Sequence, residues 1–409
     1  RRQVRSSMIT WLFDRRNKHG YLPNLIKDET LIPKSDQWWD LCINPPFSYE
    51  FRFLKYCMAD RIDFQTALVS DEWSEPAYYP VNIMFWDKDI DYLALMDPDS
   101  LEKLKQGKFK FLFYYSEGDD PYVEILDHLH QMLETHNVSM DNIRIVTANW
   151  LMHDVHPFIY FPDDEVYYRY LHLHDDNYAR EINFGQRDKK FTCLNRADKV
   201  WRRMFSAGLH DLGLTHDAYF SYTGYQYETP AHEEDSFANW KELNENIAGV
   251  VASFELQMPY RCDDLLDQEH NNHKLINKDF FQNAYWNFVV ETHFTQETVF
   301  LTEKTFKPIL NLQPFIIIGN PGSIKLLQQL GYKTFGQVID EQYDDVIHHQ
   351  DRMKELYHLS YCIADRSHKD QIHLQHILKD TLEFNQKHFL APKVSRIKNL
   401  FNQLEYVDA

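Results

Sequence analysis

The sequence predicts an α/β protein of two domains, and three observations carry that prediction. The chain has 409 residues, whereas a single hydrophobic core stops growing at roughly 250 to 300 residues. Hydrophobic residues make up 44% of the chain, including 28 Phe and 25 Tyr, so overall disorder is excluded. Short apolar or aromatic runs alternate with longer helical patterns, which is typical of parallel sheets covered by helices.

In the first domain, three buried runs are predicted as strands, at residues 65–69, 110–115 and 143–146. Between the last two, the segment 121–136 carries apolar residues at helical spacing, namely Ile125, Leu126, Leu129, Met132 and Leu133. This spacing predicts a β-α-β unit with a right-handed crossover. Around 151–187 the pattern breaks down into Asp, His, Tyr and Pro, and we place the domain junction there.

A second α/β series follows the junction. The predicted strands are 190–194, 219–222, 287–291, 314–318 and a short one around Val338; the predicted helices are one from Lys199 and those at 237–254, 279–286, 302–312, 323–330 and much of 365–405. We therefore predict two Rossmann-like α/β/α domains facing a central cleft, residues 1–175 and 176–385. A C-terminal helix at 386–409 is predicted to pack back on the first domain.

The composition excludes several classes of partner. With 43 basic and 62 acidic residues the formal net charge is −19, so we do not expect binding to nucleic acid or to anionic membranes. No apolar run approaches the roughly 18 residues of a membrane-spanning helix. The five cysteines never form C-x-x-C, which favours a reducing, cytoplasmic location. Because the chain begins with Arg rather than Met, a signal, anchor or further domain upstream stays open.

Glycine is scarce, and its positions exclude the common phosphate-binding loops. None of the 12 glycines forms G-x-G-x-x-G, and Gly208 and Gly213 are followed by Leu214 where a Walker loop needs Lys. An anionic ligand is therefore expected to be bound by side chains and a helix N-terminus.

The most informative segment surrounds a predicted strand that ends at Glu291. A polar loop follows it, and a helix begins near Thr302 and carries Glu303, Lys304 and Lys307. Ligands of open α/β sheets bind beyond the carboxyl ends of the strands, near helix N-termini. There Glu303 can accept both hydroxyls of a ribose, and Lys304 can neutralise a phosphate. Alternatively, Glu303 only stabilises the helix and the lysines form a solvated face.

A second segment, residues 187–203, opposes the charge of the whole chain, because it holds seven basic and two acidic residues. It contains a predicted strand that runs into Asn195 and Arg196, followed by Arg202 and Arg203 on a predicted helix. Its position in the same domain suggests the second half of one diphosphate site. The alternative is a solvated helix face.

These segments resemble a known family. The run Tyr285-Trp-Asn-Phe-Val-Val-Glu291, followed after ten residues by Thr302-Glu303-Lys304, resembles the donor-binding motif of the α-1,3-fucosyltransferases, where Glu and Lys contact the ribose and diphosphate of GDP-fucose. The segment at Asn195 resembles the family's strand whose following Arg clamps the diphosphate. The C-terminal half also resembles glycosyltransferase-like proteins of bacteriophages and large viruses, which would place the chain in the cytoplasm of an infected cell.

The resemblance implies a GT-B glycosyltransferase, with a nucleotide sugar as donor, a glycan or other hydroxyl as acceptor, and no required cofactor or metal. The donor-binding residues would be Asn195, Arg196, Arg202, Arg203, Glu291, Thr302, Glu303, Lys304 and Lys307. The pattern also departs from the family, since Thr292 replaces Asn and Phe306-Lys307-Pro308 replaces an aromatic-x-Asn-Ala run. Either a GDP-sugar or a UDP-sugar therefore stays open as the donor.

An inverting transfer needs a general base beside the acceptor hydroxyl. We expect Glu117, in the loop after the predicted strand 110–115, because it follows the carboxyl end of that strand. Glu72 is the next candidate, while Asp119 or Asp120 is expected to cap the following helix.

Other classes of protein stay open as alternatives to a GT-B glycosyltransferase. The 21 histidines form no H-E-x-x-H motif. Asp87, Asp89 and Asp91 have the D-x-D spacing of a manganese-dependent GT-A enzyme, although such triplets are more often exposed turns. A non-catalytic protein that binds a sugar or nucleotide is a further alternative, and an enzyme that glycosylates modified DNA bases is a minority one. The sequence does not indicate an oligomeric state.

Overall fold

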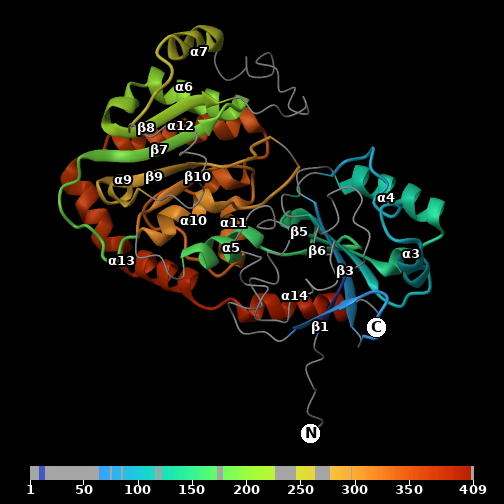
Figure 1. Ribbon diagram of the computed structural model, residues 1–409. Helices are drawn as coiled ribbons and strands as arrows, with labels where there is room; N and C mark the ends of the chain where they lie inside the picture. Colours follow the sequence, from blue (N-terminus) through green and yellow to red (C-terminus); the bar gives the residue numbers. More distant parts are fainter. Residues whose placement is uncertain are drawn as a thin grey trace. The chain divides into compact units, whose positions relative to one another are not determined.

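The computed structural model describes residues 9–13, 64–73, 76–83, 86–115, 118, 122–172, 178–225, 246–262, 277–295 and 297–406. The chain divides into two compact units (Figure 1). Unit 1 consists of Arg1–Tyr170 and Pro392–Ala409, and unit 2 of Leu171–Ala391. The chain thus passes between units at 170/171 and 391/392, where the sequence placed boundaries at 175/176 and 385/386.

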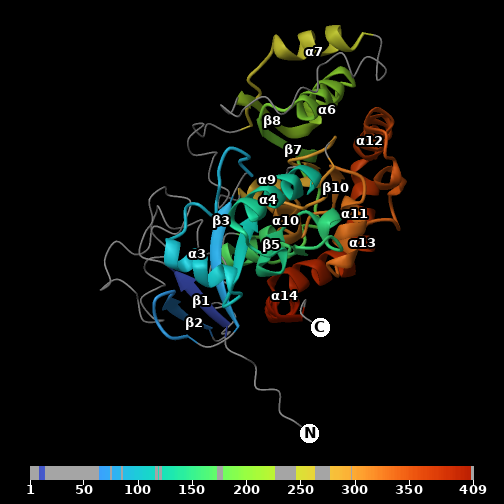
Figure 2. The same ribbon diagram turned by 90° about the vertical axis from the view of Figure 1, so that its right-hand side faces the viewer.

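Unit 1 is built on a six-stranded parallel sheet of order β2-β1-β3-β4-β5-β6. Its strands are β1 (Ile9–Phe13), β2 (Phe64–Leu68), β3 (Ala77–Ile83), β4 (Lys110–Tyr115), β5 (Ile143–Thr147) and β6 (Phe158–Tyr160). Its helices are α3 (Pro98–Lys105), α4 (Tyr122–His136), most of α5 (Asp163–His172) and α14 (Val394–Tyr406). Figure 2 shows α3 and α4 beside the strands of this sheet.

The predicted β-α-β unit is confirmed by β4, α4 and β5. Helix α4 buries Ile125, Leu129, Met132 and Leu133, because residues three and four apart share one helix face. These side chains join a core rich in aromatic residues. The segment around 151–187, in which the sequence pattern breaks down, contains β6 and α5.

Unit 2 is built on a four-stranded parallel sheet of order β10-β9-β7-β8. Its strands are β7 (Lys189–Ala197), β8 (Ala218–Tyr225), β9 (Ala284–Val290) and β10 (Phe315–Ile318). Its helices are α6 (Val200–Asp211), α7 (Ile247–Glu255), α9 (Lys278–Gln282), α10 (Glu303–Leu310), α11 (Ser323–Gln329), α12 (His349–Ala364) and α13 (His368–Leu390). In Figure 1, α6 lies above the strands of this sheet, and α10 and α13 lie below them.

Two element predictions in unit 2 are wrong. The predicted helix 279–286 ends at Gln282, because Ala284 and Trp286 pair with β7 and start β9. The predicted strand around Val338 is a turn, in which the backbone N–H groups of Val338 and Ile339 donate to the carbonyl of Phe335. Of the predicted helix 237–254, the described part begins at Asn246, and helix α7 begins at Ile247.

Both units are therefore α/β, with parallel sheets flanked by helices, as two Rossmann-like domains would be. The C-terminal helix α14 belongs to unit 1, as predicted. Among the residues placed by the structure, no helix combines the length and apolarity that crossing a membrane requires.

Candidate functional site

The carboxyl end of β9 is organised around the carboxylate of Glu291, which is only 2% exposed. One oxygen accepts from the backbone N–H of Thr302 at 3.1 Å and from the Thr305 hydroxyl at 2.6 Å. The other accepts from the Thr302 hydroxyl at 2.6 Å and from the backbone N–H of Thr292 at 3.2 Å. Four donors within the fold thus surround this carboxylate, which ties the start of α10 to the end of β9.

The first turn of α10 presents an acid and a base side by side. Thr302 is the N-cap residue, and its hydroxyl accepts from the backbone N–H of Lys304. The Lys304 ammonium lies 3.1 Å from the Glu303 carboxylate, and it also contacts the hydroxyls of Thr292 and Thr302 at 3.3 and 3.2 Å. Both charged side chains are partly exposed, at 29% for Lys304 and 20% for Glu303, so solvent and ligands can reach them.

Lys307 lies one turn further along α10. Burial lowers its pKa because it disfavours the charged ammonium, while Glu303 opposes that effect and Lys304 adds to it. The Lys307 side chain therefore lies close to the Glu303–Lys304 pair, in surroundings that disfavour its charged form.

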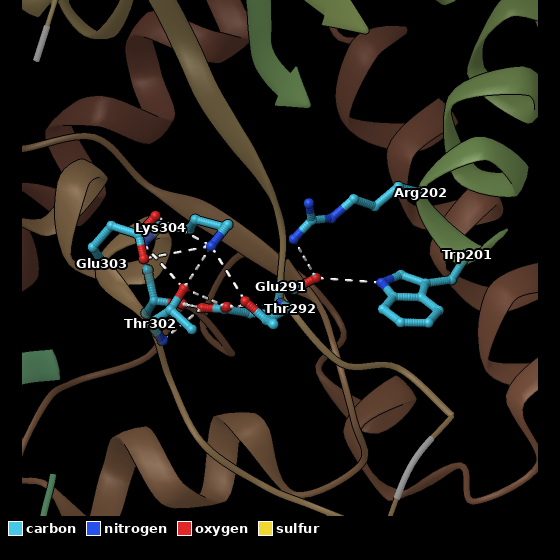
Figure 3. Close-up of polar contacts among 8 residues, drawn as sticks. Trp201, Arg202, Glu291, Thr292, Thr302, Glu303 and Lys304 are labelled. Carbon is cyan, nitrogen blue, oxygen red and sulfur yellow. Dashed lines mark hydrogen bonds and ion pairs between the residues drawn. The ribbon is translucent and has the colours of Figure 1, made fainter. Parts of the chain in front are cut away.

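Helix α6 approaches the same strand end from the other side. The indole N–H of Trp201 and the guanidinium of Arg202 both donate to the backbone carbonyl of Glu291, each at 3.3 Å. Figure 3 shows these two side chains reaching the end of β9 from α6, and Glu303 and Lys304 lying on its opposite side. The structure thus brings Arg202, Glu291, Thr302, Glu303 and Lys304 together.

The N-terminus of α6 has two features that suit an anion. Its N-cap residue, Lys199, provides no side-chain capping bond, and its first turn has no acidic residue. The first backbone N–H groups of a helix lack intrahelical partners, and the helix dipole favours negative charge there. A phosphate group would therefore be stabilised at this helix end.

The remaining predicted donor residues are held by other contacts. The Arg203 guanidinium pairs with Asp198, and also with Glu255 at 2.9 Å. The Asn195 amide is buried and contacts the Cys193 thiol and the Ser206 hydroxyl, each at 3.4 Å.

The backbone carbonyl of Arg196 accepts from the Thr223 hydroxyl at 2.9 Å, and its side chain is half-buried. A ligand-binding role for Asn195, Arg196 and Arg203 stays a prediction.

The candidate bases belong to unit 1. Glu117, Asp119 and Asp120 lie outside the described residues. Their neighbour Gly118 is described, and its backbone carbonyl accepts from the Asn149 side chain at 3.2 Å. Glu72 is exposed in the turn that follows β2.

The D-x-D triplet forms a local turn. The Asp87 side chain accepts from the backbone N–H of Asp89 at 2.9 Å, and Asp91 accepts from that of Ala94 and contacts His136 at 2.7 Å. In the described part of the chain, no group of three or more His, Cys, Asp or Glu is placed to hold a metal ion.

Sequence reasoning missed the anchoring roles of Trp201, Thr292 and Thr305. The spacing of Thr302 and Thr305, three residues apart at a helix start, was a usable signal, because such residues lie on one helix face. Nothing local identified Trp201 as a donor to a strand end 90 residues away.

Comparison with known proteins leaves the family open. The sequence matches no protein-family model and no curated protein sequence. The structure is similar to a solved one described as "OtsA apo structure", at a TM-score of 0.40 and 11% sequence identity, over 93% of this chain and 80% of that chain. A likeness this weak does not identify a family.

Proposed function

We propose that the protein is a glycosyltransferase and that unit 2 binds the diphosphate and ribose of a nucleotide-sugar donor at the carboxyl edge of its sheet. One observation carries this proposal. The N-termini of α6 and α10 converge on the end of β9, and they bring Arg202, Lys304 and Glu303 with them. Two cations and a carboxylate at helix N-termini match a ligand that combines phosphates with vicinal hydroxyls.

Each side chain would have a distinct role. The Glu303 carboxylate would accept hydrogen bonds from the two ribose hydroxyls, since a carboxylate is an acceptor only. Lys304, which contacts Glu303 in the structure, would turn to the diphosphate and neutralise it. Arg202 and the start of α6 would bind the other phosphate, while Glu291 and Thr302 would hold α10 in place.

The chemistry would be an inverting displacement without an obligatory metal. The charge that develops on the leaving diphosphate would be stabilised by fixed cations and helix ends. Glu117 would act as general base and take the proton of the acceptor hydroxyl, which belongs to a glycan or another alcohol. Arg203, which is paired with Asp198 and Glu255, would support α6.

The test is to titrate the protein with GDP, UDP and their glucose or mannose derivatives, with and without magnesium. Binding is measured by calorimetry and by thermal shift. We expect at least one nucleotide to bind, and Glu303→Ala and Lys304→Ala each to weaken binding by about tenfold, as the loss of one charged hydrogen bond implies. Glu383→Ala and Lys379→Ala, at exposed positions of α13, are matched controls that should bind normally.

The donor site would be refuted if none of these nucleotides bound. It would also be refuted if Glu303→Ala bound them with unchanged affinity. Turnover separates an enzyme from a binding protein. Donor hydrolysis by the wild type that is lost in Glu117→Gln supports catalysis, whereas binding without any turnover would indicate a nucleotide-sugar-binding protein. Strict manganese dependence would instead favour the GT-A alternative.

A further inference from the structure

A single buried arginine connects three loops at the carboxyl edge of the sheet of unit 2. Arg352, in the first turn of α12, is only 1% exposed. Its guanidinium donates to the backbone carbonyls of Gly319 at 3.1 Å, Val346 at 2.7 Å and Ile347 at 3.0 Å, and also to that of Phe294. Phe294 follows β9, Gly319 follows β10, and the other two residues lead into α12.

The surroundings of this charge are unusual. A buried cation is expensive unless it is paired or fully hydrogen-bonded, and the Arg352 guanidinium donates to backbone carbonyl dipoles. The ring of Phe294 adds a cation–π contact at 4.2 Å. Burial lowers the pKa of Arg352 to about 10, against an opposing effect of Asp344, so the guanidinium remains charged at neutral pH. The planar fork of Arg can reach several carbonyls at once, which Lys cannot do.

The loops that Arg352 joins belong to the candidate donor site. The β9–α10 loop begins with Glu291 and Thr292 and leads to Lys304, which contacts Thr292. A second bond joins this loop to the β10–α11 loop, since the amide of Asn320 donates to the carbonyl of Thr298. The two loops also touch at their starts, where a Cβ on Gly319 would lie 3.3 Å from the Cβ of Glu291.

We propose that Arg352 is a positioning residue of the donor site: it holds the β9–α10 loop in the arrangement that binds the nucleotide, and it does not contact the ligand. This inference rests on the proposed function. Without the four carbonyl bonds, the loop populates other arrangements, and only the binding-competent fraction of molecules captures ligand. Apparent affinity falls in proportion to that fraction.

Binding kinetics separate positioning from contact. With GDP and UDP as probes, stopped-flow experiments would compare the wild type, Arg352→Met, Arg352→Lys and Lys304→Met. If the competent fraction falls to about one tenth, Kd rises about tenfold. For Arg352→Met we expect the apparent association rate to carry this loss, with the dissociation rate unchanged. For Lys304→Met we expect faster dissociation, because a contact is lost from the complex.

Salt dependence provides a second readout, because Arg352→Met and Lys304→Met each remove one positive charge. Only the charge that contacts phosphate should reduce the dependence of Kd on ionic strength. Lys354→Met, at an exposed position on the same helix, is the control and should bind like the wild type. Arg352→Lys keeps the charge but not the fork, so it should resemble Arg352→Met.

Hydrogen exchange follows the loops independently of any nucleotide. Amides of 291–295, 297–301 and 319–322 should exchange faster in the Arg352 variants, while α13 and the described part of unit 1 keep their protection. Should Arg352→Met fail to fold, Arg352→Lys and the milder Phe294→Leu carry the same measurements. Wild type that binds neither nucleotide refutes the proposed function. The positioning role alone is refuted if the wild type binds a nucleotide and the Arg352 variants bind it equally well. It is also refuted if these variants differ from the wild type only in faster dissociation.

Discussion

Glu291 offers the sharpest test of how the candidate site is built, because the structure and the sequence resemblance give it different roles. The resemblance makes it a donor-binding residue, whereas the structure surrounds its carboxylate with two backbone N–H groups and two hydroxyls. The substitution Glu291→Gln preserves size and removes the charge. If Glu291 mainly anchors α10, the main effect of this change should be a lower free energy of unfolding of unit 2, and not the loss of a ligand contact.

The expected magnitude follows from where the donors lie. The N–H of Thr292 points to one carboxylate oxygen and the N–H of Thr302 to the other. Neither can become an acceptor, so either orientation of a Gln amide leaves one N–H, that of the half-buried Thr292 or that of the buried Thr302, facing an NH₂ group. A stranded buried donor costs about 1–3 kcal/mol, and the bonds that remain lose their charge assistance. We therefore expect unit 2 to lose about 3 kcal/mol.

The assay is thermal and urea unfolding followed by tryptophan fluorescence, with Trp201 and Trp286 buried in unit 2. Unit 2 has about 220 residues, a size at which 1 kcal/mol shifts Tm by about 2–4 °C. Glu291→Gln should thus lower its Tm by about 6–12 °C. The exposed change Glu383→Gln should have almost no effect. A Tm shift below about 2 °C would contradict the anchoring role.

Three further predictions concern other parts of the chain. Gly118→Ala should destabilise unit 1 by more than about 2 kcal/mol, because φ is +72° and the new Cβ would lie 2.6 Å from the Thr147 hydroxyl; Gly213→Ala, at φ +72° with nothing within 4 Å, should cost only about 1 kcal/mol in urea unfolding. Burial raises the pKa of the Cys193 thiol to about 12, so iodoacetamide at pH 8 should leave Cys193 unmodified in the native protein and alkylate it in urea, as mass spectrometry would show. Burial likewise raises the pKa of Asp344 from 3.8 to about 6, so the folded state holds this proton more tightly than the unfolded chain. The resulting stabilisation, at most about 3 kcal/mol, is present below pH 4 and is lost as the pH rises through 6. Urea unfolding at pH 4.5 and 7.5 should therefore show that the free energy of unfolding of the wild type, relative to that of Asp344→Asn, is larger at the lower pH. An equal difference at both pH values would contradict this prediction.

The sequence pattern correctly predicted those helices and strands whose apolar residues recur within the element itself. Helix α4 follows from its apolar spacing, and β4 from an uninterrupted apolar run that is buried throughout. The boundary between α9 and β9 depends instead on pairing with β7, which takes Trp286 into the sheet. Propensity within residues 279–286 carries no information about that partner.

The candidate site shows the same division between local and distant information. Helix α10 and its cap at Thr302 could be predicted because capping is local. The enclosure of Glu291 could not, since it depends on how the chain folds back after 11 residues. Likewise, the pairing of Arg203 with Glu255 joins residues 52 apart, so the local sequence does not show that Arg203 already has an acidic partner.

The basic segment 187–203 shows how a correct charge count can mislead about charge location. Its seven cations lie at both ends of β7, a nine-residue strand that spans about 30 Å. At the amino end, Arg187 donates to the carbonyls of Asn183 and Ala284, and burial lowers its pKa to about 10. Lys189 and Lys190 likewise donate to backbone carbonyls, so the cations at this end support the fold.

The cations at the carboxyl end of β7 are the ones that could bind an anion. Arg203 is paired with two acids there. Arg202 lies against the end of β9, on the helix whose first turn has no acidic residue. Because parallel strands all place their carboxyl ends at one edge, Lys304 reaches the same end of β9 from α10. In the proposed donor site, the positive charge offered to a diphosphate would thus come from two helices, and only a minority of the cations in 187–203 would contribute to it.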